Sequence, residues 1–313
     1  MESPISVENV PLESDDARRV ARRLHILLEP VAAGSYFAPE TASAYEAIGL
    51  PEASGYWCGR SAPLGRVPTE VVVATFAVWE PSIVAKSLDT GWGSGVTHAS
   101  VMAARIQGAG AFVERGLGGA PPQRIAELLR RATEAIFPAG YPLFAALAST
   151  PWPEEPATAF WFGADLLREQ RNDAHIASWR AVGLDPVETH ILSALWSGQP
   201  FHLRAAFMGW RRSHITSAKE RLEARALIEG DPPTFTEAGH EVRAEIEEAT
   251  DRQQRPALDA LGADVDDLLD LLELAYQALL PTVVDQGSRT GGVATSGGTT
   301  GARLPDPELL NPL

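Results

Sequence analysis

The sequence predicts a mainly α-helical protein. Apolar residues recur mostly at spacings of three and four, which is the period of a helix with one buried face. Glycine and proline divide the 313 residues into segments of helical length, and no β-rich run has a second such run nearby to pair with. With 45% hydrophobic residues the chain can bury a substantial core, and its length favours about two domains.

The longest apolar runs are short or interrupted by acids, so none provides the roughly 20 residues that a membrane helix needs. The first thirty residues carry early acids and lack the apolar core of a signal peptide. We therefore expect a cytoplasmic protein with no membrane partner. The single cysteine, Cys58, rules out an internal disulfide and any multi-cysteine zinc site, and we predict neither a metal nor a cofactor.

The formal net charge of −15 disfavours a large non-specific nucleic-acid surface, because such binding depends on concentrated lysine and arginine. All but two of the 26 basic residues are arginines, whose planar guanidinium suits pairing with carboxylates. We expect most of these arginines to pair with the 41 acids of the chain.

Residues 15–183 are predicted to form a helical ligand-binding domain that follows a flexible N-terminus at 1–14. The helices expected in this half cover residues 17–30, 38–50, 67–81, 98–113, 122–137 and 160–180. Three glycines fall within residues 87–100, so we expect this segment to form a loop before the helix that begins at His98.

The chain restarts after Gly183, where Asp185, Pro186 and Glu188 supply an N-cap, a proline at the first helical position and a capping-box partner. Helical segments follow at 186–198, 200–208 and 210–228, then the short turn EGDPPTF and a helix from Thr236. This is the order of a winged helix-turn-helix with a small β-wing. We assign residues 184–255 to that domain.

Residues 185–254 resemble the winged-helix domain of MarR-like regulators. There the recognition helix runs into the pattern RLxxxGLI, and LTxxG opens the helix after the wing. The matching residues here are Arg221-Leu222, Leu227-Ile228 and Phe235-Thr236-Glu237-Ala238-Gly239. Most of residues 20–262 further resembles a poorly characterised helix-turn-helix family associated with bacterial natural-product pathways, through segments such as GRSAPLG, WEPSIV and REQRNDAHIASW.

Terminal helices build the dimer in MarR-like proteins, so the resemblance implies a homodimer formed through a C-terminal packing or dimerisation helix at 256–283. The run DVDDLLDLLELAYQALL is apolar on more than one face, which is typical of a buried helix. Packing of this helix on the N-terminal half is the alternative. Residues 284–313 are rich in Gly, Ser, Thr and Pro and are predicted to be a disordered tail.

A DNA-binding interpretation depends on the expected recognition helix, which carries Arg211, Arg212, His214 and Lys219. Against it, the wing has two acids and no arginine or lysine, and residues 185–250 carry seven basic residues against eleven acids. DNA is therefore a possible but disfavoured partner. A MarR-like, ligand-responsive transcriptional regulator is the alternative function.

A second group of candidates lies on the helix expected at 160–180. At about 100° per residue, one face carries arginine, asparagine and histidine framed by tryptophans. Aromatic walls around a few polar groups suit a small-molecule site, whereas a buried ion network between domains is the alternative. The candidate site residues on this face are Trp161, Arg168, Arg171, Asn172, His175 and Trp179.

Within this face, His175 could transfer a proton near neutral pH with Asp173 or Glu169 as its acid partner. Arg168 or Arg171 could hold a carboxylate, enolate or phenolate. Both arginines are also within side-chain reach of polar neighbours on the same helix.

Glu29 and Glu80 each end an apolar helical run before a proline, where a carboxylate can have a raised pKa and act as a general base. Aromatic residues cluster near both of them in the sequence. They either line a ligand pocket or fill the core. The ligand-binding candidates in this region are Glu29, Tyr36, Trp57, Arg60 and Trp79.

Members of the resembling family often carry histidine at the positions of Ala33, Glu80 and Gln170, whereas His175 matches them. This departure favours a cofactor-free role. The leading hypothesis from the sequence is a natural-product pathway protein that binds a small apolar, polyketide-like molecule. Its chemistry would be cofactor-independent acid/base catalysis of the cyclase, isomerase, dehydratase or hydrolase type.

Overall fold

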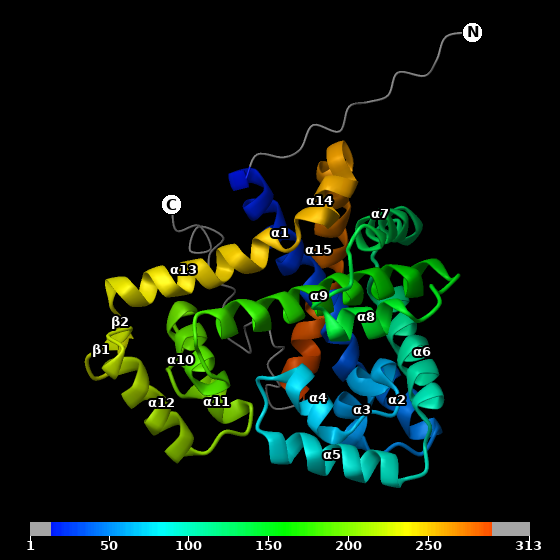
Figure 1. Ribbon diagram of the computed structural model, residues 1–313. Helices are drawn as coiled ribbons and strands as arrows, with labels where there is room; N and C mark the ends of the chain where they lie inside the picture. Colours follow the sequence, from blue (N-terminus) through cyan, green and yellow to red (C-terminus); the bar gives the residue numbers. More distant parts are fainter. Residues whose placement is uncertain (1–13, 290–313) are drawn as a thin grey trace.

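The computed structural model describes residues 14–289, and residues 1–13 and 290–313 lie outside the described part. The protein is mainly helical, as predicted, and one two-stranded antiparallel sheet is present in the described part (Figure 1). No helix within these bounds combines the length and the apolar character needed to cross a membrane. The predicted flexible N-terminus and most of the predicted disordered tail fall on residues that are not described.

The N-terminal half is a bundle organised around α9, which crosses the centre of the molecule and buries most of its residues (Figure 1). Glu155 caps this helix and Pro156 occupies its first position. The elements are α1 (Ser14–Ala32), η1 (Gly34–Phe37), α2 (Pro39–Ala47), η2 (Glu52–Ser54), α3 (Gly55–Ser61), η3 (Ala62–Leu64), α4 (Thr69–Phe76), α5 (Pro81–Gly93), α6 (His98–Gly116), α7 (Pro122–Glu134), α8 (Pro142–Ala148) and α9 (Pro156–Ala181).

The C-terminal half begins with the capping box predicted from the sequence: the Asp185 carboxylate accepts the backbone N–H of Glu188 at 2.8 Å, and the Glu188 carboxylate accepts that of Asp185 at 2.9 Å. In the β-hairpin, Ile228 lies opposite Phe235. The elements are α10 (Pro186–Trp196), α11 (Leu203–Phe207), α12 (Arg212–Ala224), β1 (Ile228–Glu229), β2 (Thr234–Phe235), α13 (Glu237–Arg252), α14 (Arg255–Leu261), η4 (Gly262–Asp264) and α15 (Val265–Arg289).

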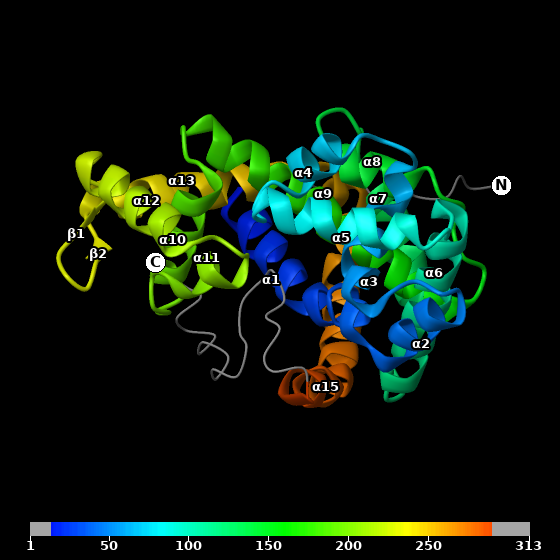
Figure 2. The same ribbon diagram turned by 90° about the horizontal axis from the view of Figure 1, so that it is seen from below.

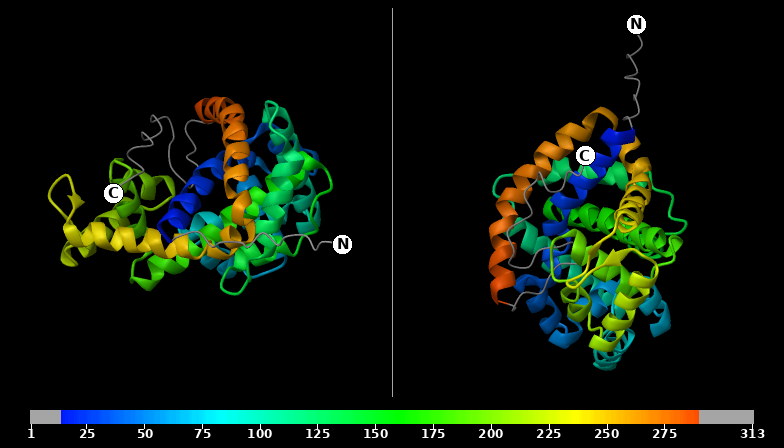
Figure 3. Two further views of the ribbon diagram at one scale, coloured as in Figure 1. Left: turned by 90° about the horizontal axis from the view of Figure 1, so that it is seen from above. Right: turned by 90° about the vertical axis from the view of Figure 1, so that its left-hand side faces the viewer.

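The buried apolar residues of the described part form two hydrophobic cores. The larger core joins the N-terminal helices to α14 and α15, and the smaller core lies among α10, α12, the hairpin and α13. Figure 2 shows α10–α12 and the hairpin on one side of α1, with α2, α3 and α6 on the other. The helix α13 links the two parts, because it runs from the hairpin to α14 (Figure 3).

Two segments of the N-terminal half differ from the sequence expectation. The helix α4 ends at Phe76, because Ala77 adopts a positive φ of 50° and residues 77–80 form a loop. Conversely, α5 continues to Gly93, so that only residues 94–97 form the expected loop. The reason is close packing: a Cβ atom at Gly91 would lie 2.2 Å from the Cys58 sulfur, so glycine here permits a helix contact.

The C-terminal helix expected at 256–283 is divided into α14 and α15 at Gly262, which has a φ of 55°. The helix α15 continues to Arg289, beyond the predicted start of the tail. Its buried residues, including Leu272 and Leu279, belong to the larger core, and α15 packs on α1, α6 and α7 (Figure 3). Intramolecular packing therefore accounts for the apolar face from which a dimer was predicted.

Candidate functional site

Four charged side chains of α9 are buried in ion pairs with other helices: Asp165, Arg168, Glu169 and Arg171. Glu169 accepts two hydrogen bonds from Arg60 of α3, at 2.9 and 2.7 Å, and a third from Arg168 at 3.0 Å. Arg168 also donates from Nε to Glu29 of α1 at 3.2 Å. Burial alone would raise the pKa of Glu169, but Arg60 and Arg168 outweigh it and lower this pKa to about 2.

One turn earlier on α9, Asp165 forms a second buried pair, with Arg105 of α6. The Tyr36 hydroxyl bridges both acids, at 3.3 Å from Asp165 and 3.1 Å from Glu169. Burial raises the pKa of Asp165 to about 6, although Arg105 opposes the shift. The Arg105 guanidinium also lies over the rings of Tyr36 and Trp161, at 4.9 and 5.3 Å.

Arg171 joins α9 to the C-terminal helices. It donates to Asp251 of α13 at 2.8 Å, to Gln254 at 3.0 Å and to Glu247 at 3.2 Å. Both arginines that were predicted to hold a ligand anion, Arg168 and Arg171, are therefore buried and paired with carboxylates from other helices. These contacts correspond to the ion network between helices that the sequence left as the alternative to a pocket.

Asp173 and His175 face different helices. The Asp173 carboxylate accepts the backbone N–H groups of Leu143 and Phe144, at 2.9 and 3.0 Å, where α8 begins. Its burial raises its pKa to about 7. His175 lies 3.2 Å from the Thr250 hydroxyl of α13, and burial lowers its pKa to about 3, so that the imidazole is neutral at physiological pH. The structure does not bring these two groups together as an acid/base pair.

Among the remaining candidates, Glu80, Trp161 and Trp179 have structural contacts, whereas Asn172 does not have a full set. Glu80 caps α5 by accepting the backbone N–H groups of Ser82 and Ile83 at 3.0 and 3.2 Å. The Trp161 indole donates to Ser35 at 2.9 Å inside the larger core. Trp179 lies in the smaller core, and the Asn172 amide nitrogen has no hydrogen-bond partner among the described residues.

Several predicted ligand-binding residues do meet, in a group of rings that we call the aromatic cluster. Its members are Tyr36, Phe37, Tyr56, Trp57, Phe76, Trp79 and Phe207. Trp57 and Trp79 lie 4.6 Å apart, and Arg60 covers the Phe76 ring at 4.7 Å. Sequence reasoning missed Phe207, because α11 is distant in the chain and only the fold brings it to Trp79.

The 77–80 loop connects the aromatic cluster to the helices α10, α11, α12 and α13 and their hairpin, which we call the α10–α13 unit. The Val78 carbonyl accepts hydrogen bonds from His190 Nε2 at 2.8 Å and from Trp210 Nε1 at 2.9 Å. The backbone N–H of Glu80 donates to the Met208 carbonyl at 3.0 Å. Burial lowers the pKa of His190 to about 4, so its neutral imidazole carries the hydrogen on Nε2 that Val78 accepts. No sequence signal pointed to these contacts.

The start of α12 exposes basic and polar side chains, whereas its other face enters the smaller core through Ile215, Ala218 and Leu222. Within the described part of the chain, Arg211 and Arg212 form no ion pair. The exposed residues at this end are Arg211, Arg212, Ser213, His214, Thr216 and Ser217.

The remaining charges of the α10–α13 unit differ from those at the start of α12. Lys219 pairs with Glu223 at 2.5 Å, and Arg221 donates to Glu188 at 2.9 Å. The turn between β1 and β2 carries Asp231 and no basic residue. Among the predicted DNA contacts, the structure therefore separates the exposed Arg211, Arg212 and His214 from the paired Lys219.

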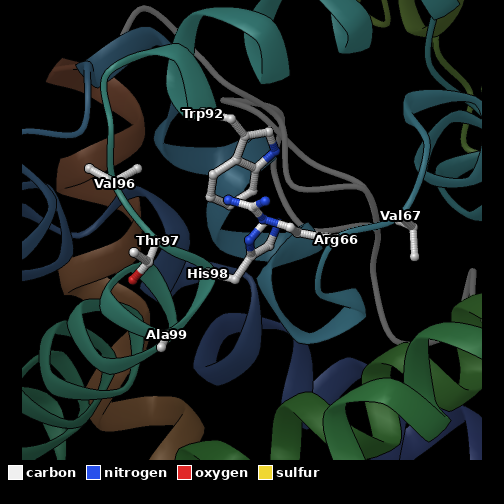
Figure 4. Close-up of a pocket in the computed structure, with 7 residues that line it drawn as sticks. All are labelled: Arg66, Val67, Trp92, Val96, Thr97, His98 and Ala99. Carbon is white, nitrogen blue, oxygen red and sulfur yellow. The ribbon is translucent and has the colours of Figure 1, made fainter.

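A hollow of about 560 Å³ lies elsewhere, where the connection between η3 and α4 faces the end of α5 and the start of α6 (Figure 4). Trp92 and His98 stack there with ring centroids 4.0 Å apart. The lining residues are Arg66, Val67, Trp92, Val96, Thr97, His98 and Ala99. No group of three His, Cys, Asp or Glu side chains within residues 14–289 is arranged to hold a metal ion.

Comparison with known proteins gives one match. A model described as a helix-turn-helix family matches residues 21–285, which is most of the chain. No curated protein and no solved structure matches the chain. The match extends over the N-terminal helices as well as the α10–α13 unit.

Proposed function

The chain belongs to this helix-turn-helix family, and from that premise we propose that it binds double-stranded DNA through α12 as a ligand-responsive regulator. In this proposal α10, α11, α12, the hairpin and α13 form a winged helix-turn-helix of the MarR-like type. The helix α12 is then the recognition helix, which enters the major groove with its N-terminal residues toward the base edges.

The observation that carries the proposal is the exposed start of α12. Arg211 and Arg212 project there without an ion-pair partner among residues 14–289, beside the exposed His214. Arginine can donate two hydrogen bonds to guanine in the major groove, and histidine and serine can donate to phosphates or bases. Most other arginines within residues 14–289 are held in ion pairs, so this pair is available to an external anion.

The charge of the unit indicates how such binding would work. The acidic hairpin turn and the paired Lys219 leave few cations for flanking phosphates, so we expect weak non-specific binding and a shallow dependence on salt. Specific affinity would then depend on base contacts and on a second copy of the chain. A homodimer would place two α12 helices about one DNA turn apart on a symmetric site.

A small apolar molecule is the second partner in this proposal. The aromatic cluster supports it, because it gathers predicted ligand-binding residues where the larger core meets the α10–α13 unit. A setting in a bacterial natural-product pathway remains part of the proposal through the family resemblance. A cofactor-independent acid/base enzyme has less support, because Asp173, His175 and Glu80 already bond helix ends or neighbouring helices.

Selection from a random duplex library at low salt, followed by anisotropy titrations, tests the DNA-binding proposal. We expect one enriched sequence that binds roughly tenfold or more tightly than a shuffled duplex. The double variant Arg211→Ala/Arg212→Ala should lose this preference while its circular dichroism and melting curve stay unchanged.

The matched control removes the same charge elsewhere. Arg130 and Arg252 have side chains that are 56% and 64% exposed, and both lie outside α12. The variant Arg130→Ala/Arg252→Ala should bind the enriched duplex almost as the unchanged protein does. An equal loss in both double variants, or no enriched sequence at all, would contradict the proposal.

A further inference from the structure

The hollow beside α5 and α6 has the size of a small-molecule site. Its volume of about 560 Å³ falls within the roughly 300–1,000 Å³ that is typical of pockets for one small ligand. It is lined by the connection between η3 and α4, by the end of α5 and by the start of α6 (Figure 4). A hollow of this size suits a compact molecule and not a folded protein domain.

One wall of the hollow is a pair of stacked rings. The Trp92 indole and the His98 imidazole have centroids 4.0 Å apart and planes inclined by 25°. A short turn holds them together, because the Ser94 hydroxyl donates to the Gly91 carbonyl at 2.8 Å and Gly95 adopts a φ of 88°. Both rings are only partly buried, so this pair offers part of its aromatic surface to a planar ring.

Arg66 brings a positive charge to the same hollow. Its side chain is exposed and forms no ion pair or hydrogen bond within residues 14–289. Burial and the nearby Arg66 guanidinium lower the pKa of His98, so the imidazole is neutral at physiological pH and can donate one hydrogen bond. Figure 4 shows the Arg66, Trp92 and His98 side chains converging on one place.

The lining of the hollow contains no acid. The Thr97 hydroxyl already caps α6 by accepting the backbone N–H of Ser100 at 3.0 Å. Most arginines of the described part pair with carboxylates, whereas the hollow offers Arg66 only apolar, hydroxyl and aromatic neighbours. A guanidinium without a counterion, beside an aromatic pair and apolar walls, is complementary to a ligand that combines a negative charge with a flat ring. The apolar lining residues are Val67, Val96 and Ala99.

From this combination we infer that the hollow binds a small aromatic carboxylate. The ring of the ligand stacks against Trp92 and His98, and its carboxylate pairs with Arg66, whose planar fork of N–H groups matches two carboxylate oxygens. Because Arg66 is exposed, this pair contributes selectivity more than affinity. The inference goes beyond the proposed function and does not depend on DNA binding, since none of the lining residues belongs to the α10–α13 unit.

NMR titration of the full chain with 2-naphthoate tests this site. The Trp92 indole N–H resonance is assigned by its loss in the Trp92→Phe variant, and we expect 2-naphthoate to shift it in a saturable manner. Two related probes each change one property of the ligand. The uncharged 2-naphthamide keeps the aromatic rings, and decahydro-2-naphthoate keeps the charge on a saturated ring system. Both should bind about fivefold more weakly than 2-naphthoate.

Three variants assign these preferences to residues, with affinities measured by titration calorimetry. Arg66→Met removes the charge, so this variant should bind 2-naphthoate and 2-naphthamide about equally. Arg252→Met removes an arginine that is 64% exposed on α13 and should keep the preference for the carboxylate. Trp92→Leu keeps an apolar contact with the larger core but removes the ring, so the preference for 2-naphthoate over its saturated analogue should disappear.

Each preference is a ratio measured within one protein, so a partial loss of stability in a variant does not alter it. No shift of the Trp92 resonance at the solubility limit of 2-naphthoate overturns the inference. Equal binding of 2-naphthoate and 2-naphthamide by the unchanged protein also overturns it, as does a carboxylate preference that survives Arg66→Met. A failure to enrich any DNA duplex contradicts only the proposed function and leaves the result at the hollow unchanged.

Discussion

Arginine side chains have different roles in the buried network of α9 and at the exposed start of α12. Arg60 and Arg168 lie among carboxylates, and their side chains are 2% and 6% exposed. Arg211 and Arg212 are exposed and form no ion pair within the described residues. A buried arginine with bidentate partners contributes to the unique packing of helices, whereas an exposed arginine without partners is free to bind an external group.

The largest expected effect comes from breaking the buried network. Glu169→Ala leaves Arg60 buried without its carboxylate partner and removes one of the two carboxylates beside Arg168, so we expect the free energy of unfolding to fall by about 3–5 kcal/mol. Urea denaturation followed by circular dichroism measures this loss. The exposed pair Arg130–Glu134 gives the contrast, since Glu134→Ala should change stability by less than about 0.5 kcal/mol.

A double variant sharpens this result. Arg60→Met/Glu169→Leu removes both charges and should recover much of the stability lost in Glu169→Ala, because burying an ion pair carries a large desolvation cost. If the double variant is as unstable as Glu169→Ala, the stability lost in Glu169→Ala does not come from the uncompensated charge of Arg60 alone.

An intermediate effect is expected from pH. Burial lowers the pKa of His175 to about 3, from an unfolded value near 6.5, although Glu247 opposes the shift. Between these values the unfolded chain binds a proton that the folded protein does not bind, so the free energy of unfolding falls as the pH falls from about 6.5 toward 3.

A histidine variant isolates this contribution from that of the other titrating groups. His175→Gln should weaken the loss of stability on acidification, measured by urea denaturation at pH 7, 6 and 5. Identical pH profiles in the unchanged protein and in His175→Gln would show that His175 is not held neutral by burial.

The smallest effect on stability is expected at α12 itself. Arg211→Ala/Arg212→Ala should change the free energy of unfolding by less than about 0.5 kcal/mol, because neither side chain is buried or paired within the described part. The same variant should lose sequence preference for DNA. A loss of stability above about 1 kcal/mol would show that these arginines stabilise the fold as the buried arginines of α9 do. The contrast between the two regions would then be wrong.

The candidate site was partly predictable because some of its residues are close in sequence. Tyr36, Trp57 and Trp79 meet through Tyr56 and one another, as both sequence interpretations, a ligand pocket or a filled core, require. The partners of Arg168 and Arg171 were not predictable, because Glu29 and Asp251 come from helices more than 70 positions away. Helical periodicity identified the face of α9 and could not identify what covers it.

Local sequence determined the helices and several of their boundaries. The capping box at Asp185, the proline that starts α10 and the hairpin near Phe235 depend on residues within a few positions of one another. Such contacts join residues that are close in the chain, so their pattern is readable without a fold.

Tertiary structure alone decided where α4 ends, why α5 continues through Gly91 and which groups hold the start of α12. Ala77 adopts a positive φ in a loop whose next residue, Val78, is bonded to His190 and Trp210 from the other core. Gly91 stays helical against Cys58. These features depend on contacts between residues that are distant in sequence, and their energies outweigh local propensity once the two cores are packed together.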